Sequence, residues 1–489
     1  MRIRLSLVLI LILCAAATAG AETITLDEYL DRIHKVHPFF EKESLSVAIE
    51  SRAQEGLLGA EDWNLSGSSY YSHQKLLASS AFSPDRLDAL GIDAAAQRAF
   101  WRTGGRLSLS WSSQFSDQKL SDIVIPFPGG NMVVPTGPSE FYQHRLYASY
   151  SQPLLQNYGG TLDRLAFELS EYDIDFTEVQ ILENQEGFLA DLAGRFLDWV
   201  LFTEQKRIAE ERKLLAEEEL ERTVEKRRSY LVDQVDVLRA EDAVRIAEQN
   251  VVLVESQWKA LRAELSVLCR SEEMCRKSPL FDLYHTEPFP SPEEARRKLR
   301  EQSRILNTLG IRRDQLVHLR NGYQEQVRPQ LFLNVGAGLQ GGDDQFGDAL
   351  VLDKPDMAVS LMFQYPLENR AARTNVATAT LEIDRLEKEI ENVSLELESA
   401  AVNLLILIQE LEKVLQLNRE QIESAGAKTE EELDLYNQGR SDLTFVILSR
   451  DNEQQAKLTY AQNAASYQKL ILQYHALMDE FFTDRKWKY

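Results

Sequence analysis

The residue types that carry most enzyme chemistry are sparse in this chain and are not grouped. Seven histidines and three cysteines are spread over 489 residues, without an HExxH metal motif, a phosphate-binding glycine loop or a nucleophile elbow. His34 and His37 lie three residues apart on one predicted helix and could share a metal ion. Two histidines on a surface helix are more often solvated. The sequence therefore predicts no enzyme, no cofactor and no metal site.

The first 21 residues are organised as a secretory signal peptide. Two arginines precede an apolar run over residues 5–13, and small residues follow as far as Ala21. Cys14 leaves a lipidated N terminus open, although Leu13 stands where a lipoprotein signal has a small residue. We expect the mature protein to leave the cytoplasm, and no other window has the length and apolar character of a spanning helix.

Cys269 and Cys275 are the cysteines expected to remain after signal removal. They are separated by five residues in an oxidising compartment, which favours an intramolecular disulfide closing a small loop. The alternative is two unpaired thiols near a helix end.

The chain is strongly acidic, with a formal net charge of -23. Nucleic acid is therefore an unsuitable partner, because phosphate binding needs a basic face. The acidity is assigned to solvated helix surfaces, with an acidic channel lining as the alternative.

Two very long helical segments are expected, over residues 161–229 and 371–437. Neither contains proline, and at 1.5 Å per residue each would be on the order of 100 Å long, which exceeds a globular domain. Each follows an alternating, strand-like segment that ends at a proline, at 146–152 and 357–365. A strand followed by a giant helix, twice, predicts a duplicated architecture.

A second pair of segments matches at a spacing of 266 residues. Residues 25–60 are predicted as one helix kinked at Pro38, and they align with a predicted helix over 291–326, with Glu28 on Glu294. The predicted organisation is a signal peptide at 1–21, a first structural repeat at 22–268, a mid-height linker at 269–290, a second repeat at 291–482 and a C-terminal tail at 483–489.

Two further segments have the alternation of lipid-facing barrel strands. In residues 106–115, Leu107, Leu109 and Trp111 alternate with serines, and residues 331–340 alternate in the same way. An edge of a soluble β-sandwich alternates too and is the alternative. The connections over 117–142 and 341–355 suit long loops at the outward end of a barrel.

Residues 65–104 are harder to place. Residues 63–73 could be another strand, but three crossings would leave the chain on the wrong side for its long helix. We therefore expect 106–115 to be the membrane strand, and 65–104, with a helical stretch over 85–101, to be an insertion without an assigned position.

The helix lengths predict four columns of matching height. The return helix over 232–268 is too short to accompany residues 161–229, so the helix over 291–326 completes that column, and 442–482 with 25–60 completes the other. Heptads in the second long helix predict coiled-coil packing. They comprise Ile390, Leu397, Leu404 and Leu411, and three residues further on Val393, Ala400, Leu407 and Val414.

Four strands per chain are too few to close a barrel, and open edges in lipid leave backbone groups unsatisfied. Three copies would give twelve strands with an aqueous lumen, and cyclic symmetry would close the helical columns into a tube.

With these features the chain resembles the outer-membrane efflux protein family, the TolC-like trimeric channels, over essentially its whole mature length. The matching segments are residues 24–30 (ITLDEYL) with His37-Pro38, 103–105 (TGG), 151–155 (SQPLL), 365–367 (YPL) and 436–439 (YNQG). The resemblance implies an α+β membrane protein, with long antiparallel α-helical hairpins forming an α-barrel in the trimer and four β-strands per chain in a 12-stranded outer-membrane β-barrel.

The resemblance also implies a function. The chain would be the outer-membrane channel subunit of a tripartite export system, a passive duct for small molecules from periplasm to exterior. Its expected partners are two further copies, outer-membrane lipid, a periplasmic adaptor (membrane fusion) protein and an inner-membrane pump or ABC exporter. The alternatives are a channel of type I protein secretion and a non-conducting periplasmic coiled-coil scaffold.

In this architecture the gate lies where the long helices turn back. In the second turn Gly439 can take the left-handed conformation that ends a helix, and Asp442 lies near the next helix start. In the first turn Tyr230 stands where the second has glycine. Residues 445–448 are apolar, so a ring of carboxylates is not expected there.

By the resemblance, Asp236 and Tyr436 face each other across neighbouring helix pairs with Arg440 nearby, and hydrogen bonds and an ion pair hold the tips closed. The alternative is that these are ordinary cap and turn residues.

Overall fold

The computed structural model describes residues 22–77, 84–120, 123–134, 138–273 and 276–481. The predicted signal peptide, Cys14, Cys275 and the tail at 483–489 lie outside the described residues. The chain forms two compact units. The first combines Met1–Ser46, Glu178–Leu309 and Glu389–Tyr489, and the second combines Val47–Thr177 and Gly310–Lys388.

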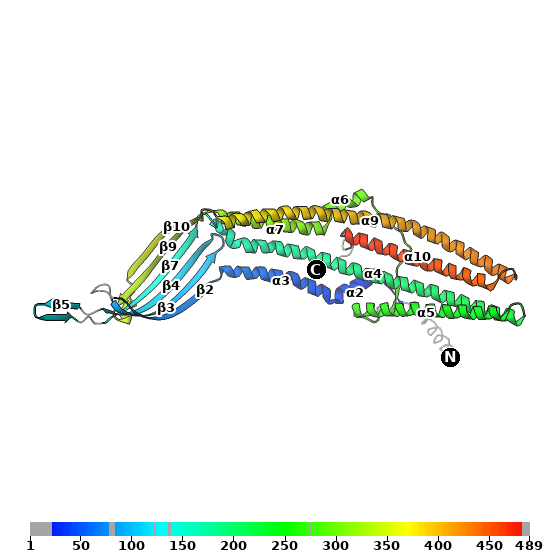
Figure 1. The fold of residues 1–489 in the computed structure, drawn as a ribbon, viewed down its shortest axis with the longest axis horizontal. Helices are drawn as coiled ribbons and strands as arrows, with labels where there is room; N and C mark the ends of the chain where they lie inside the picture. Colours follow the sequence, from blue (N-terminus) through cyan, green and yellow to red (C-terminus); the bar gives the residue numbers. More distant parts are fainter. Residues whose placement is uncertain (1–21, 78–83, 121–122, 135–137, 274–275, 482–489) are drawn as a thin grey trace, which may run out of the picture. The chain divides into compact units, whose positions relative to one another are not determined.

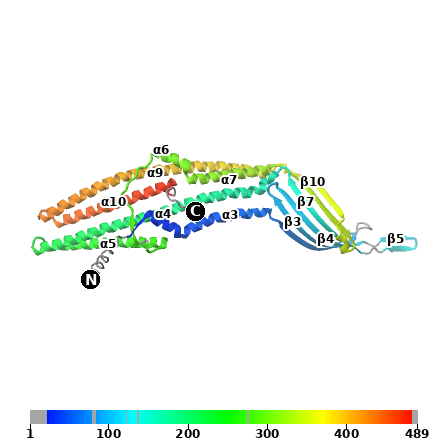
Figure 2. The ribbon, with the colours of Figure 1, turned by 180° about the vertical axis from the view of Figure 1, so that it is seen from behind.

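Two helical hairpins of equal dimensions provide most of the helix. Helix α4 (Thr161–Arg228) turns back into α5 (Gln234–Leu268), and α9 (Arg370–Asn437) turns back into α10 (Leu443–Leu477). The long helices have 68 residues each and the return helices 35 each, so the hairpins repeat at a spacing of 209 residues. The two helices of each hairpin lie side by side in both ribbon views (Figure 1, Figure 2).

Two shorter helix pairs repeat at the 266-residue spacing found in the sequence. They are α2 (Leu26–Val36) with α3 (Pro38–Leu57), and α6 (Pro292–Gln302) with α7 (Arg304–Val327). Both α2 and α6 begin with a capping box: Thr25 and Ser291 each accept a hydrogen bond from the backbone N–H of the glutamate three residues on. The same local chemistry therefore starts both pairs.

Each short pair is interrupted by one extended residue. Pro38 keeps His37 out of the helical region (φ -82°, ψ 129°), which turns the predicted kink into a break. The prediction of a continuous helix over 291–326 was wrong, because Ser303 is also extended (ψ 124°). Here the backbone N–H of Arg304 donates to the Asp479 carboxylate at 2.6 Å, so a tertiary acceptor replaces the helical one.

Aromatic side chains from both repeats share the core of the first unit. Tyr29 of α2 packs against Phe196 of α4 at 5.5 Å between ring centroids, and Phe196 meets Trp199 edge-on at 5.7 Å. Tyr467 and Tyr474 of α10 belong to the same buried cluster. Strands β1 (Thr23–Thr25) and β8 (Ser278–Leu280) pair in parallel, which ties the N-terminal segment to the linker between the repeats.

The heptads of α9 are only partly covered within one chain. Leu397, Leu404 and Leu411 pack against the core. Leu407 and Val414, from the second set of heptad positions, are 44% and 37% exposed. The stripe thus continues beyond the surface that this chain itself covers.

The second unit contains a six-stranded antiparallel sheet in the order β10-β9-β7-β4-β3-β2 (Figure 1). Its strands are β2 (Asn64–Lys75), β3 (Pro84–Phe100), β4 (Gly105–Leu120), β7 (Pro138–Pro153), β9 (Gln330–Asp343) and β10 (Lys354–Gln364). Within the described residues, no helix has the length and apolar character required to cross a membrane.

The sheet corrects the expectation of four strands per chain. The segment 65–104, left unplaced by the sequence, supplies most of β2 and β3, and β3 occupies the stretch expected as a helix over 85–101. The chain runs through the sheet four times before α4 begins, as β2, β3, β4 and β7, in alternating directions. It therefore leaves the sheet at the same end at which it entered, whereas three strands would have left it at the opposite end.

Strand β3 shows tertiary pairing overriding local preference. Its run Ala94-Ala95-Ala96 favours a helix by intrinsic propensity. In the structure β3 pairs with β2 on one side and β4 on the other, so two ladders of backbone hydrogen bonds hold it extended. The overlooked signal was alternation: Leu90 and Ile92 share one face of the strand with the alanines at 94 and 96.

The connections carry smaller elements. Strands β5 (Ile123–Phe127) and β6 (Gly130–Val134) form a separate hairpin between β4 and β7, and α8 (Phe346–Ala349) lies between β9 and β10. The short helices η1 (Leu58–Glu61) and η2 (Tyr158–Gly160) lie at the junctions before β2 and after β7.

The two hairpin turns have the same backbone conformation despite different residues. Tyr230 has φ 58° and Gly439 φ 70°, both left-handed. In each turn the following N–H reaches back to the final helical turn, from Leu231 to Lys226 O at 2.9 Å and from Arg440 to Leu435 O at 2.8 Å.

We predict that Tyr230→Gly stabilises the protein by up to about 1 kcal/mol, because the left-handed conformation is strained for residues with a Cβ. The Tyr230 side chain is 89% exposed, so little packing is lost. Thermal unfolding in detergent, followed by circular dichroism, measures the change. The matched variant Gly439→Ala should move stability the other way by about 1 kcal/mol, and equal effects at the two turns would contradict the account.

Candidate functional site: a two-faced sheet and the helix tips

An apolar row crosses all six strands on one face of the sheet, and polar residues such as His73 and Asp88 lie on the same face nearer the loops. The cross-strand register places one residue of each strand in a continuous row: Leu65, Ala96, Leu109, Ala148, Ala337 and Met357. Large neighbours on this face, including Trp111, Leu146 and Val359, are exposed within the chain. A continuous apolar surface of this kind requires an apolar environment.

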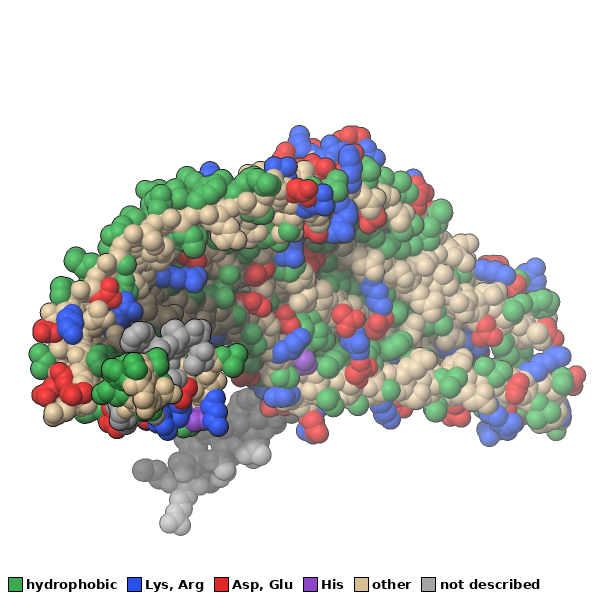
Figure 3. Space-filling view, turned by 60° about the vertical axis from the view of Figure 1, so that its left-hand side comes forward, with side chains coloured by type: hydrophobic (Ala, Val, Ile, Leu, Met, Phe, Trp, Pro, Cys, Tyr) green, Lys and Arg blue, Asp and Glu red, His purple; other side chains and the backbone are tan. Residues whose placement is uncertain are grey.

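The opposite face is polar on every strand. A second continuous row contains Ser68, Asp93, Ser112, Arg145, Gln340 and Lys354. In the space-filling view, green hydrophobic side chains gather along the outer edge at the left, and the hollowed surface beside them is mainly tan with scattered charges (Figure 3). One face of the sheet therefore suits lipid and the other water.

Polar side chains link β7, β9 and β10 across the polar face. Arg145 forms an ion pair with Asp356, and its guanidinium lies 4.3 Å from the centroid of the Tyr147 ring. The Tyr147 ring covers Gly336 and Gly338, where a Cβ would come within 2.1 and 2.3 Å of neighbouring atoms. Glycine is thus required there so that the tyrosine can lie flat on the sheet.

At the helix tips one arginine joins the two hairpins. Arg239 Nη1 of α5 lies 3.2 Å from Asp236 Oδ1 and 3.4 Å from Asp442 Oδ1 at the start of α10. Asp442 also caps α10: it accepts the Thr444 hydroxyl at 2.6 Å and the Thr444 backbone N–H at 2.8 Å, and these hydrogen bonds hold the pKa of its carboxyl below the usual value. Asp236 accepts the backbone N–H of Asp233 at 3.2 Å. Both predicted aspartates therefore serve as caps as well as ion-pair partners.

Tyr436 is buried at the tip among Ala240, Leu443 and Val446. The Lys226 ammonium lies 3.6 Å from the ring centroid and donates to the Tyr436 carbonyl at 3.4 Å. Burial raises the pKa of the Tyr436 phenol, and the nearby carboxylates of Asp236 and Asp442 raise it further.

The structure brings Asp236, Tyr436 and Asp442 together, but the residues that contact them are not the ones expected. The ion pair assigned to Arg440 is made within this chain by Arg239, and Arg440 instead donates to Gln438 in its own turn at 3.3 Å. Gly439 supplies the left-handed residue of that turn. The gating role of these residues remains a prediction.

Sequence analysis missed Lys226 and Arg239. Arg239 follows Asp236 by three residues, a spacing at which helical side chains meet. Lys226 lies in the last turn of α4, where a cation favours the helix dipole. Neither signal indicates which residues of the other hairpin will be contacted.

The predicted disulfide also remains a prediction. Cys269 caps the C terminus of α5 and is buried in the core of the first unit. Cys275 lies outside the described residues.

The histidines weighed as metal ligands pack against aromatic rings. His34 lies 4.5 Å from Phe40, and His37 lies 4.9 Å from Phe188, between ring centroids. His37 Nδ1 also accepts the backbone N–H of Phe39 at 3.3 Å. Burial lowers the pKa of both imidazoles.

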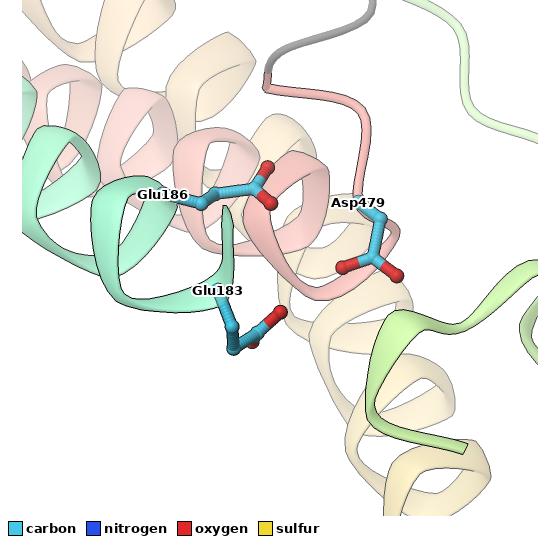
Figure 4. Close-up of side chains that lie close together, drawn as sticks. All are labelled: Glu183, Glu186 and Asp479. Atoms are coloured by element: carbon cyan, nitrogen blue, oxygen red, sulfur yellow. The ribbon is translucent and has the colours of Figure 1, made fainter. Parts of the chain in front are cut away.

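One acidic group in the described part of the chain has the spacing of a metal site. Carboxylate oxygens of Glu183, Glu186 and Asp479 lie within 4.8 Å of one another (Figure 4). Arg304 occupies their centre: it pairs with Glu186, lies 3.1 Å from Asp479 and 3.5 Å from Glu183. The group is therefore an ion-pair cluster that fixes the start of α7.

Solved structures with this fold are outer-membrane proteins. The chain matches the outer membrane protein VceC from Vibrio cholerae with a TM-score of 0.64 at 10% identity, over 92% of this chain and 95% of that one. It matches the CmeC outer membrane channel from Campylobacter jejuni with a TM-score of 0.63 at 12% identity, over 94% of this chain and 87% of that one. It matches the open MtrE outer membrane channel from Neisseria gonorrhoeae with a TM-score of 0.61 at 13% identity, over 93% of this chain and 88% of that one. No family model and no curated protein matches the sequence. The predicted fold class is confirmed, with six strands in the sheet of this chain.

We predict that Arg304→Gln destabilises the protein by about 3 kcal/mol, because it leaves buried carboxylates unpaired. The side chain of Glu186 is only 2% exposed. Thermal unfolding in detergent measures the loss. The control Arg313→Gln, at an exposed arginine of the same helix, should stay within about 0.5 kcal/mol.

We predict that Glu183→Gln stabilises the protein, whereas Arg304→Gln destabilises it. Burial, followed by the Asp479 charge, raises the pKa of Glu183. When folding raises the pKa of an acid, the free energy of unfolding falls as the pH rises from the pKa of the unfolded state to that of the folded state. Removing the charge of Glu183 should therefore stabilise the protein at neutral pH. A loss of stability in Glu183→Gln would contradict this reading of the cluster.

Proposed function

We propose that this chain, which has the fold of the outer-membrane channels described above, is the outer-membrane channel subunit of a tripartite export system. Three copies would form a passive duct for small molecules from the periplasm to the exterior. A periplasmic adaptor protein and an inner-membrane pump or ABC exporter would supply the cargo and the energy.

The two-faced sheet carries this proposal. An apolar row crosses all six strands on one face and is exposed within the chain, and a polar row crosses the same six strands on the other face. In a bilayer such a sheet is stable only when it closes, because an open edge leaves backbone groups without partners. A closed sheet with lipid outside and water inside is a pore.

The helices support assembly with further copies. On α9, Leu407, Val414 and Leu417 follow heptad-related spacing and are exposed. On α5, Leu238, Ile246 and Leu253 are exposed at nearly the same spacing. Helices of a neighbouring copy can cover these stripes by coiled-coil packing, and cyclic symmetry then closes a tube.

The helix tips are the proposed gate of the duct. Arg239 joins the two hairpins of one chain through Asp442 and also pairs with Asp236 of its own helix, and Lys226 of the first hairpin holds Tyr436 of the second. Because the two hairpins meet there through ion pairs, weakening those pairs would allow the tips to separate.

Recording single-channel currents of the detergent-purified protein in a planar lipid bilayer tests the function. We expect a trimer that requires detergent for extraction and conducts ions through a narrow, mostly closed pore. A water-soluble monomer, or a trimer without current, would favour the coiled-coil scaffold and refute the duct. Efflux of small molecules and protein secretion are distinguished by which cargo accumulates in cells lacking the protein.

We predict that Arg239→Gln increases the mean conductance at least several-fold, because it removes the cation shared by Asp236 and Asp442 while leaving both caps in place. The measurement uses the same bilayer. The control Arg245→Gln removes an exposed arginine of the same helix that pairs only with Glu241 among the described residues. If the two variants conduct alike, Arg239 does not hold the tips.

A further inference from the structure

We propose that the assembled protein closes a barrel of eighteen strands, six from each of three copies, instead of the twelve that the resemblance implies. This inference rests on the proposed function, and it concerns the edges of the sheet as a surface for two further copies of this chain. Four observations support it: where the extra strands enter the repeat, what faces they present, how the edges run and how wide the sheet is.

The extra strands are an insertion into one repeat. Elements before the insertion match their counterparts at a spacing of 266 residues, as α2 matches α6, and elements after it match at 209, as α4 matches α9. The first half therefore holds 57 additional residues. By these spacings β2 corresponds to β9 and β7 to β10, so β3, β4, β5 and β6 have no counterpart in the second half.

Strands β3 and β4 are built as membrane wall. Leu90 and Ile92 of β3, and Leu109 and Trp111 of β4, lie on the same face as Leu146 of β7. A hairpin outside the bilayer would not need an apolar face in line with that of its neighbours. The polar row crosses both strands as well, so each separates lipid from water.

The edges of the sheet fit each other around a ring. The sheet ends at β2 on one side and β10 on the other, and with six antiparallel strands these edges run in opposite directions. The β2 edge of one copy can therefore pair in antiparallel fashion with the β10 edge of the next. Apolar side chains at the edges, Leu65 at 80% and Met357 at 81%, are more exposed than Leu109 at 41% in the interior.

Six strands also match the helical wall in width. Parts of α3, α4, α7 and α9 belong to the same unit as the sheet and connect to it. Four helices packed 8–10 Å apart span about 32–40 Å. Six strands about 4.8 Å apart and tilted by about 40° span about 38 Å, whereas four would span only about 25 Å.

The consequence is a wider pore through the membrane. Barrel diameter grows roughly in proportion to strand number, so eighteen strands give about 1.5 times the diameter of twelve and about twice the cross-section.

Cryo-electron microscopy of the full-length trimer in nanodiscs, with its mass fixed by native mass spectrometry, counts the strands directly. We expect eighteen, with β3 and β4 in the wall of each copy and β2 beside the β10 of the next. A trimer with twelve strands and the β3–β4 hairpin outside the wall would overturn the inference, as would a dimer that closes twelve strands. A conducting trimer of twelve strands would leave the proposed function intact, whereas a non-conducting, water-soluble protein would refute that function itself.

Two deletions test the same point. Removing residues 78–134 deletes β3 to β6 and leaves four strands per chain, an even number, so a trimer with a barrel about 1.5-fold narrower is expected. Removing residues 123–134 deletes only β5 and β6 and should leave the diameter unchanged. Equal diameters for the two variants would overturn the inference, and if the larger deletion does not fold, the strand count of the unmodified trimer decides.

Discussion

Backbone hydrogen bonding at the sheet edges is the constraint on which the rest of this structure depends. The four interior strands of the sheet, β3, β4, β7 and β9, have a neighbour on both sides, whereas β2 and β10 have a neighbour on one side only. In lipid an unpaired edge cannot be satisfied by water, so the sheet requires a second copy or closure. The even number of strands in each half follows from a second constraint, because the chain must leave the sheet at the end where its long helix begins. The insertion of a strand pair, rather than of one strand, obeys that rule.

The helical part is subject to a different constraint. Its long helices extend beyond any globular core, so other helices must pack along their whole length. Two hairpins of 68 and 35 residues leave part of each long helix without its own return helix, and the α2–α3 and α6–α7 pairs are sized to complete it. The helix over 291–326 was expected to extend the column of α5, but α7 begins at the end of α10, where Arg304 pairs with Asp479. The pairs are joined to the hairpins by buried interactions: a shared aromatic core, and the Arg304 cluster that starts α7. Stability therefore concentrates where the segments meet.

The turns show how one backbone conformation can be reached from different residues. Gly439 takes a left-handed conformation with little strain, and Tyr230 takes the same one although its Cβ opposes it. The tips are thereby alike in geometry and unlike in chemistry. The first turn of the return helix also differs between the two tips. Arg239 of α5 pairs with Asp442 at the start of α10, whereas the residue of α10 that corresponds to Arg239 is Leu448, which carries no charge.

The sequence by itself determined the two giant helices, their duplication and the amphipathic strands β4 and β9, because each leaves a periodic signal over many residues. It did not determine β3, whose alanines favour a helix until neighbouring strands pair with it, or the break at Ser303, which depends on an acceptor 176 residues away at Asp479. At the tips it identified Asp236, Tyr436 and Asp442 through the resemblance, but only the tertiary structure showed Arg239 between the two aspartates. A periodic pattern lies within one segment and can be seen in the sequence. The partner of a backbone N–H or of a charged side chain depends instead on which distant segments the fold brings together.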